Sequence, residues 1–150
     1  MEFNHFLTSY MPNVNIGSKV HFENMLKESV LAEKCGYATV SIPEHHLINL
    51  LMMPSPLQMA VKIASITKKI NITTGIVVLP IHDMRTYAGE VTTADILTDG
   101  RLILGVGRGA FPWEMERLGT PIETSKEKFV ESLEVLQLSL IHISEPTRRR

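Results

Sequence analysis

The sequence predicts an α/β protein built on a parallel β-sheet. Short apolar segments rich in β-branched residues alternate four times with amphipathic segments of helical spacing. A helix that follows each strand returns the chain to the same edge, which makes neighbouring strands parallel. Two architectures contain such units: an open doubly wound sheet, and a (β/α)8 barrel, which takes about 250 residues and would be only half present in 150.

Composition narrows the class of protein and its partners. Of the residues, 44% are hydrophobic, enough for one domain with a core. Fifteen basic and sixteen acidic residues leave a formal charge of −1 without a basic stripe, so we expect no nucleic-acid partner. No apolar run approaches the roughly 20 residues of a membrane span, and the amino terminus lacks a signal-peptide pattern. We therefore expect a cytoplasmic protein without a membrane partner.

The first two strand–helix units fill the amino-terminal half. Residues 3–8 are predicted as a strand, and residues 22–35 as a helix closed by Gly36, with Cys35 buried at its end. Residues 39–42 are predicted as the second strand, stopped by Pro43. A helix over residues 57–67 follows, and the two lysines after it suit its carboxyl-terminal dipole.

The next two units follow the same plan. Residues 72–79 are β-branched and predict one strand, stopped by Pro80, with a helix over 84–97 after it. A turn at 99–100 leads to a strand at 102–104 and a glycine loop over 105–109. Thr124 and Glu127 form a capping-box pattern, followed by an apolar stripe at Phe129, Leu133 and Leu136 that predicts the last helix.

The glycine loop also matches a relaxed dinucleotide fingerprint at Gly105, Gly107 and Ala110. Pro112 and Trp113 are expected to interrupt the helix that this fingerprint requires. We therefore interpret residues 107–123 as a pocket-lining loop whose aromatic side chains, Phe111 and Trp113, form a small core of their own.

Polar residues gather where the predicted strands end, which in a parallel sheet is a single rim. Glu44, His45 and His46 follow the second strand. A histidine can exchange protons near neutral pH, and a neighbouring carboxylate can fix its tautomer. Adjacent residues at a strand end point in opposite directions, so we expect one of the two imidazoles to face the pocket. Arg108 in the glycine loop could meet a phosphate or a flat anionic ring.

Four blocks in this order resemble the amino-terminal half of the bacterial luciferase-like family of flavin-dependent monooxygenases. They are residues 1–8 with Phe6, residues 36–46 ending in Glu44-His45-His46, residues 74–80, and residues 99–109. The resemblance covers residues 1–137 and implies half of a (β/α)8 barrel. It further implies reduced FMN supplied by a flavin reductase, molecular oxygen, an apolar small-molecule substrate, and a dimer at full length.

The resemblance also implies roles for individual residues. His45 matches the family's catalytic histidine, and no metal is expected. Gly107 stands where the luciferase catalytic subunit has a reactive cysteine, so light emission is not expected. Lys126 stands where a second phosphate-binding arginine is common, and the wall against the flavin ring often contains a non-prolyl cis peptide. The cofactor contacts implied in this way are Phe6, Glu44, Gly75, Ile76, Arg108 and Lys126.

Three other functions remain open at this point. One is an oxidoreductase of the same barrel family that uses the deazaflavin F420. Another is a non-catalytic flavin-binding or partner subunit. The weakest is a metal-dependent hydrolase that recruits His82 and Asp83, because these residues lack a recognised ligand spacing.

The carboxyl terminus carries a separate hypothesis. Residues 138–148 resemble the translation of a transposase sequencing adapter, so we interpret 138–150 as a non-native tail after a partial barrel domain, 1–137. The alternative is a fifth strand over residues 140–143 followed by a basic tail. Half a barrel would expose strand edges and its inner face, so we expect the chain to be poorly soluble or dimeric, and inactive alone.

Overall fold

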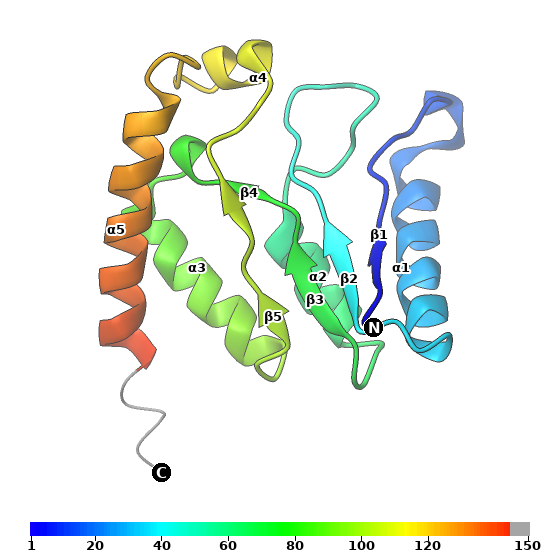
Figure 1. The fold of residues 1–150 in the computed structure, drawn as a ribbon. Coiled ribbons are helices and arrows are strands. Elements are labelled where there is room, and N and C mark those ends of the chain that lie inside the picture. The colour runs from blue at the N-terminus through cyan, green and yellow to red at the C-terminus, as the bar shows by residue number, and fades with distance from the viewer. Residues whose placement is uncertain (145–150) are drawn as a thin grey trace.

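The computed structural model describes residues 1–144 and has an α/β fold with a four-stranded parallel sheet (Figure 1). The strands lie in sequence order: β1 (Asn4–Phe6), β2 (Thr39–Ile42), β3 (Asn71–Thr74) and β5 (Leu102–Ile103). Helices α1 (Ser18–Lys34), α2 (Pro56–Ala64) and α3 (Met84–Leu97) follow the first three strands. The parallel α/β class predicted from the sequence is confirmed.

The remaining elements lie between and after these strands and helices. Strands β4 (Val77–Val78) and β6 (Val106–Gly107) pair in parallel as a second, two-stranded sheet. Two 3-10 turns, η1 (Val14–Ile16) and η2 (Leu79–Ile81), precede α1 and α3. Helices α4 (Pro112–Arg117) and α5 (Ser125–Ser144) follow β6. No helix within residues 1–144 combines the length and the apolar character that crossing a membrane requires.

The strand register separates the two faces of the main sheet. Phe6, Ser41, Thr73 and Ile103 lie in one row across the four strands. Phe6 is 53% exposed and Ile103 is 48% exposed at the two ends of this row, so no helix within residues 1–144 covers these ends of the face. The neighbouring row contains Val40 and Ile72, both fully buried against the helices.

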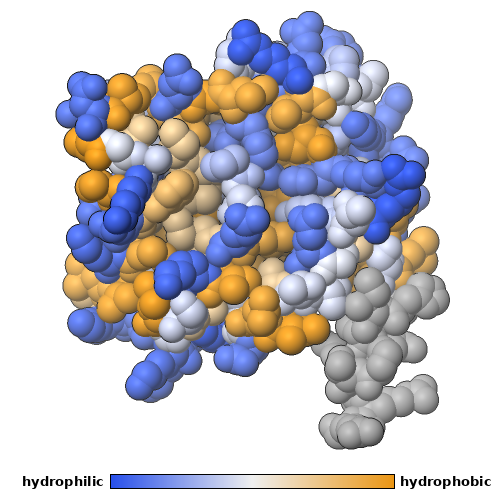
Figure 2. All heavy atoms as spheres, turned by 180° about the vertical axis from the view of Figure 1, so that it is seen from behind, coloured by the Kyte–Doolittle hydropathy of each residue, from blue (hydrophilic) through white to orange (hydrophobic). Residues whose placement is uncertain are grey.

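Two hydrophobic clusters join the helices to the covered face. The first packs α1 and α2 against the main sheet, through side chains that include Met25, Ala60, Ile63, Val40, Ile42 and Ile72. The second packs α2, α3 and α5 around β4 and η2, through side chains that include Leu57, Tyr87, Val91, Leu136, Val77 and Leu79. Figure 2 shows the molecule from this helical side, where hydrophobic side chains remain visible between the charged ones.

This arrangement differs from a doubly wound sheet in two respects. The strand order β1-β2-β3-β5 follows the sequence without the reversal that creates a topological switch point. Helices α1, α2 and α3 lie on one side of the sheet rather than on both (Figure 1). Each crossover therefore adds the next strand on the same side of the previous one.

The single strand predicted over residues 72–79 is wrong. The chain forms β3 and β4, which are separated at the cis peptide bond between Gly75 and Ile76. The Gly75 N–H still bonds to the Ile42 carbonyl on β2 (2.7 Å), but the Val77 N–H bonds to the Gly105 carbonyl (2.8 Å). A continuous β-branched pattern cannot reveal such a change of partner. The non-prolyl cis peptide implied by the family resemblance is confirmed.

The connection after β5 also departs from the prediction. Residues 105–109 are not only a loop, because Val106–Gly107 forms β6 against β4. Pro112 does not interrupt a helix but starts α4, since its fixed φ and missing N–H suit the first helical turn. Phe111 and Trp113 form no core of their own, because each is 45% exposed.

Smaller differences concern helix ends. Cys35 is exposed, not buried, at the end of α1. The Thr124 hydroxyl donates to the Pro121 carbonyl (3.1 Å) in place of the expected capping contact. The alternative of a strand over residues 140–143 is wrong: α5 continues to Ser144, and Leu140 extends its apolar stripe onto the second cluster. Residues 145–150 of the proposed tail lie outside the described part of the chain.

The turn before β5 shows how a polar side chain can hold the base of the sheet. Asp99 and Gly100 both adopt positive φ, 56° and 69°. This turn places the Arg101 guanidinium beneath the end of α2. It donates to the Ala64 carbonyl (2.8 Å), the Thr67 hydroxyl (3.0 Å) and the Ile70 carbonyl (3.3 Å). One side chain therefore satisfies the last carbonyl of α2, which has no helical partner, and also bonds to the segment that leads into β3.

Candidate active site

A pocket of about 240 Å³ lies at the carboxyl ends of β2, β4 and β6. Three segments distant in sequence form its walls. Glu44 and His45 come from the loop after β2, and Gly75 and Ile76 come from the cis segment between β3 and β4. The third wall runs from Arg108 in the glycine segment to Glu114 in α4.

The structure brings together most of the residues that the sequence assigned to a site. Glu44, His45, Gly75, Ile76 and Arg108 all line this pocket. Phe6 does not line it but lies next to Gly75 on the open face of the sheet: a Cβ on Gly75 would lie 4.0 Å from its ring. Lys126 is exposed in the first turn of α5 and is not part of the pocket wall.

Glu44 is a buried carboxylate with three hydrogen-bond donors. Its side chain is inaccessible to solvent. One oxygen accepts from His82 Nε2 (2.8 Å) and His46 Nε2 (3.1 Å), and the other accepts from the Val78 N–H (2.6 Å). Glu44 therefore ties the loop after β2 to β4 and to the start of α3, and its oxygens already have protein partners.

These contacts determine the ionisation of Glu44 and His46. Burial acts to raise the pKa of Glu44, but the hydrogen bonds from His46, His82 and Val78, with the charge of His82, outweigh it and hold the pKa below 4.5. The hydrogen bond to Glu44 raises the pKa of His46 above 6.5, against the opposing effect of burial. The pair therefore favours an ionised carboxylate and a protonated imidazole.

His82 and Tyr87 extend this network away from the pocket. Their rings stack with centroids 4.0 Å apart and an angle of 22° between planes. Burial raises the pKa of Tyr87, and the nearby charges of Glu44 and Glu90 raise it further. The phenol is thus held neutral, and His82 has one nitrogen on Glu44 and one face on an aromatic ring.

His45 faces the pocket, whereas His46 bonds to Glu44, so only one of the two imidazoles lines the pocket wall. The backbone of His45 is fixed by an N–H bond to the Met53 carbonyl (2.9 Å), part of an isolated antiparallel bridge. Its ring meets Phe111 edge-on, with centroids 5.4 Å apart. Its Nδ1 lies 3.7 Å from Glu114 Oε2.

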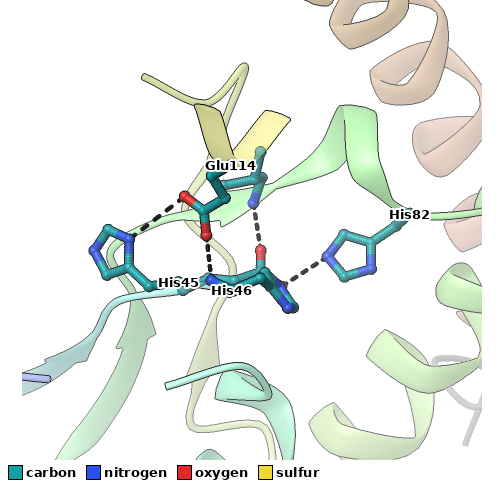
Figure 3. Close-up of polar contacts among 6 residues, drawn as sticks. His45, His46, His82 and Glu114 are labelled. Carbon is teal, nitrogen blue, oxygen red and sulfur yellow. Dashed lines mark hydrogen bonds and ion pairs between the residues drawn. The ribbon is translucent and has the colours of Figure 1, made fainter. Parts of the chain in front are cut away.

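Glu114 is a site residue that the sequence reading missed. It is 3% exposed and accepts a hydrogen bond from the backbone N–H of His46. Figure 3 shows its carboxylate above the His45–His46 segment, with His45 and His82 on either side. The available signal was Pro112, because a proline that starts a helix places the residue two positions later in the first turn.

Two glycines beside the pocket, Gly105 and Gly107, allow close packing behind Ile76. A Cβ on Gly107 would lie 2.6 Å from Ile76 Cδ1, so Ile76 packs directly over the backbone of β6. A Cβ on Gly105 would lie 2.2 Å from the Thr74 carbonyl oxygen. Only glycine permits this approach of the two strands. Ile76, which lines the pocket, is therefore supported from behind by the backbone of β6.

Arg108 is the cation of the pocket wall. It is exposed, and it forms no hydrogen bond or ion pair with another residue in the described part of the chain. Glu44 and Glu114, the two carboxylates of the pocket, are both buried and bonded to the histidine loop. Among the side chains that the structure describes, no group of three or more acidic, histidine or cysteine residues is suited to hold a metal ion.

Sequence comparison assigns this chain to a family. The model of the family described as luciferase-like monooxygenase matches residues 1–145, and the chain belongs to this family. The chain is 32% identical over 136 residues to an uncharacterised protein, y4vJ, of Sinorhizobium fredii. It is 33% identical over 97 residues, 65% of the chain, to the oxygenase component of a flavin-dependent trigonelline monooxygenase from Acinetobacter baylyi.

Solved structures give the same result. The monooxygenase RslO1 from Streptomyces bottropensis superposes with a TM-score of 0.84 at 26% identity, over 91% of this chain and 42% of that one. The matched regions cover 39% of y4vJ and 27% of the trigonelline oxygenase. The chain thus spans about two fifths or less of the proteins that it resembles.

Proposed function

We propose that the chain is part of a flavin-dependent monooxygenase that uses reduced FMN and molecular oxygen, with His45 as its acid–base residue. The observation that supports this most strongly is the pocket itself. It combines His45, an unpaired Arg108 and the Gly75–Ile76 wall in a chain of the luciferase-like family.

We also propose that residues 1–137 form the first half of a (β/α)8 barrel. Sequential parallel strands with helices on one side suit a barrel wall. The exposed row from Phe6 to Ile103 would then be the inner face that further strands enclose. Residues 138–150 remain a proposed adapter-derived tail, which sequencing the source DNA across the Gln137 codon without transposase adapters would test.

The residues present suit a flavin mononucleotide. Arg108 would bind the phosphate, because its guanidinium is free and a fork of donors matches phosphate oxygens. Gly75 and the apolar side chain of Ile76, which line the pocket, would lie against the ring. Lys126, near the start of α5 and outside the pocket wall, would supply a second positive charge to the phosphate. When bound, reduced FMN supplies the electrons with which oxygen is activated.

The protein would contribute positioning, proton transfer and exclusion of water. His45 would hold or donate a proton at Nε2, the nitrogen opposite the Glu114 contact. Phe111 and Ile76 would keep water from the reacting atoms, which favours an apolar small-molecule substrate. Glu44 would fix the loop that carries His45 and not touch the cofactor, since its oxygens are occupied.

The remaining partners are also part of the proposal. The trigonelline relative is named as an oxygenase component, which supports a separate flavin reductase that supplies reduced FMN. We further propose a dimer for the longer protein and a cytoplasmic location.

Flavin titration tests the proposal. Anaerobic binding of reduced FMN to the chain, followed by absorbance, should weaken at least about tenfold in Arg108→Ala, since a charge-assisted phosphate contact contributes more than about 1.4 kcal/mol. Arg85→Ala, a change in an exposed arginine outside the pocket, serves as the matched control. Equal binding by both variants would refute the phosphate assignment, and tighter binding of F420 than of FMN would favour the deazaflavin enzyme.

A second measurement separates an oxygenase from a non-catalytic flavin-binding subunit. In the longer gene product supplied with a reductase, His45→Ala should abolish oxygenation while flavin binding persists. Flavin binding without turnover in the unmodified protein would instead support the partner-subunit function.

A further inference from the structure

Glu114 occupies an unusual position relative to His45 and His46. Its carboxylate is buried in the first turn of α4 and contacts two neighbouring residues of one loop at once. One oxygen, Oε1, accepts the backbone N–H of His46. The other, Oε2, lies 3.7 Å from Nδ1 of the His45 ring (Figure 3).

The His45 ring has a nitrogen without a hydrogen-bond partner beside Glu114. Its Nδ1 is buried and has no hydrogen-bond partner among the described residues. An unpaired buried polar atom costs about 1–3 kcal/mol, so a small approach to a nearby acceptor is favourable. Glu44 cannot be this acceptor, because His46, His82 and Val78 already use its oxygens. Glu114 Oε2 is the acidic group that faces Nδ1.

We infer that Glu114 is a positioning residue that holds His45 with its proton on Nδ1. This leaves Nε2 as the nitrogen that exchanges protons in the pocket. The inference rests on the proposed function only for the chemistry at Nε2; the tautomer itself is a property of the chain without flavin. The arrangement follows the general rule that a second group on one ring nitrogen sets the role of the other.

The number of acceptors makes the inference testable. A glutamate has two acceptor oxygens and can serve the His46 N–H and the His45 ring together. A glutamine has one acceptor oxygen, and the buried His46 N–H would take it. The amide NH2 would then point at Nδ1 of His45 and donate to it. Glu114→Gln should therefore reverse the tautomer of His45 and place the proton on Nε2.

Two-bond ¹⁵N–¹H correlation spectra of ¹⁵N-histidine-labelled chain report each tautomer directly. The full 150-residue chain would be compared with Glu114→Gln and with Glu116→Gln, an exposed residue of the same helix. His45→Gln identifies the His45 resonances. Spectra are recorded at a pH where His45 is neutral, without flavin.

We expect His45 in the Nδ1–H form in the unmodified chain and in Glu116→Gln, and loss of that form in Glu114→Gln. An Nε2–H form in the unmodified chain would overturn the inference, whether or not any variant folds. So would an unchanged tautomer in folded Glu114→Gln. Because no flavin is present, failure of FMN binding would contradict the proposed function and leave this result standing.

Discussion

Replacing Glu44 by glutamine tests the buried network that supports the site. The carboxylate receives three donors, and glutamine offers one acceptor oxygen with an amide that cannot accept. If the oxygen stays with the Val78 N–H, the amide faces His46 and His82. Leaving a buried charged partner uncompensated costs about 3–5 kcal/mol, and relaxation of the histidines to neutral forms recovers part of it. We expect Glu44→Gln to lower the free energy of unfolding by about 3 kcal/mol.

The effect of Glu44→Gln on the free energy of unfolding should depend on pH. The folded pKa of Glu44 lies below 4.5, so its contribution is present above that value and is lost as the pH falls through the folded pKa. The folded pKa of His46 lies above 6.5, so its contribution is complete below that value and is lost as the pH rises through the folded pKa. The stability difference between the two proteins should therefore be largest between about pH 4.5 and 6.5.

Urea denaturation followed by circular dichroism, at several pH values, measures this difference. Glu90→Gln is the matched control, since Glu90 is exposed on α3 and should change stability by no more than about 0.5 kcal/mol. A Glu44→Gln protein as stable as the control between pH 5 and 6, or a difference that grows steadily toward high pH, would refute the reasoning.

Three further substitutions test the packing around the site by the same denaturation assay. Arg101→Ala should cost about 2–3 kcal/mol, because the carbonyls of Ala64 and Ile70 lose a charged donor. Arg101→Lys should recover only part of this loss. Unchanged stability in both variants would contradict the prediction. Gly105→Ala should cost about 3 kcal/mol or more, since its Cβ would lie 2.2 Å from a backbone oxygen of Thr74; native-like stability would show that the strands can separate. Gly107→Ala should cost about 1–3 kcal/mol, because its Cβ would clash with the movable Cδ1 of Ile76. Adding Ile76→Val should restore part of the loss. If the losses of the two substitutions simply add, that contact is not the cause.

The regular elements were predictable because each follows from a local pattern. Strand β2 and helix α3 have the predicted bounds, since Pro43 stops the strand and the apolar spacing of α3 continues up to the Asp99–Gly100 turn. The break between β3 and β4 could not be found in this way. Both halves are β-branched, and the pairing changes only because Val77 bonds to Gly105, a residue 28 positions later.

The site, too, was predictable only where it follows from local sequence patterns or from the family resemblance. The rim of parallel strands predicted the neighbourhood of His45 and Arg108, and the family resemblance supplied Gly75 and Ile76. The sequence did not predict Glu114, because Pro112 favours a helix interruption there, whereas in the structure it starts α4. The burial of Glu44 could not be predicted from the sequence either. It depends on contacts with Val78 and His82, which lie 34 and 38 positions later in the chain.

Glu44 and Glu114 contact different histidine groups. Their separate roles can be tested by measuring both stability and the His45 tautomer in each glutamine variant. Glu44 serves His46 and His82, and Glu114 serves the backbone of His46 and faces the ring of His45. Glu44→Gln should therefore destabilise the fold while His45 keeps its Nδ1–H tautomer. Glu114→Gln should reverse the tautomer and leave in place the pH dependence of unfolding that belongs to Glu44, whose pKa does not depend on Glu114. If either substitution produced both effects, the two acids would act as one coupled unit, and His45 would owe its orientation to the whole loop instead of to Glu114.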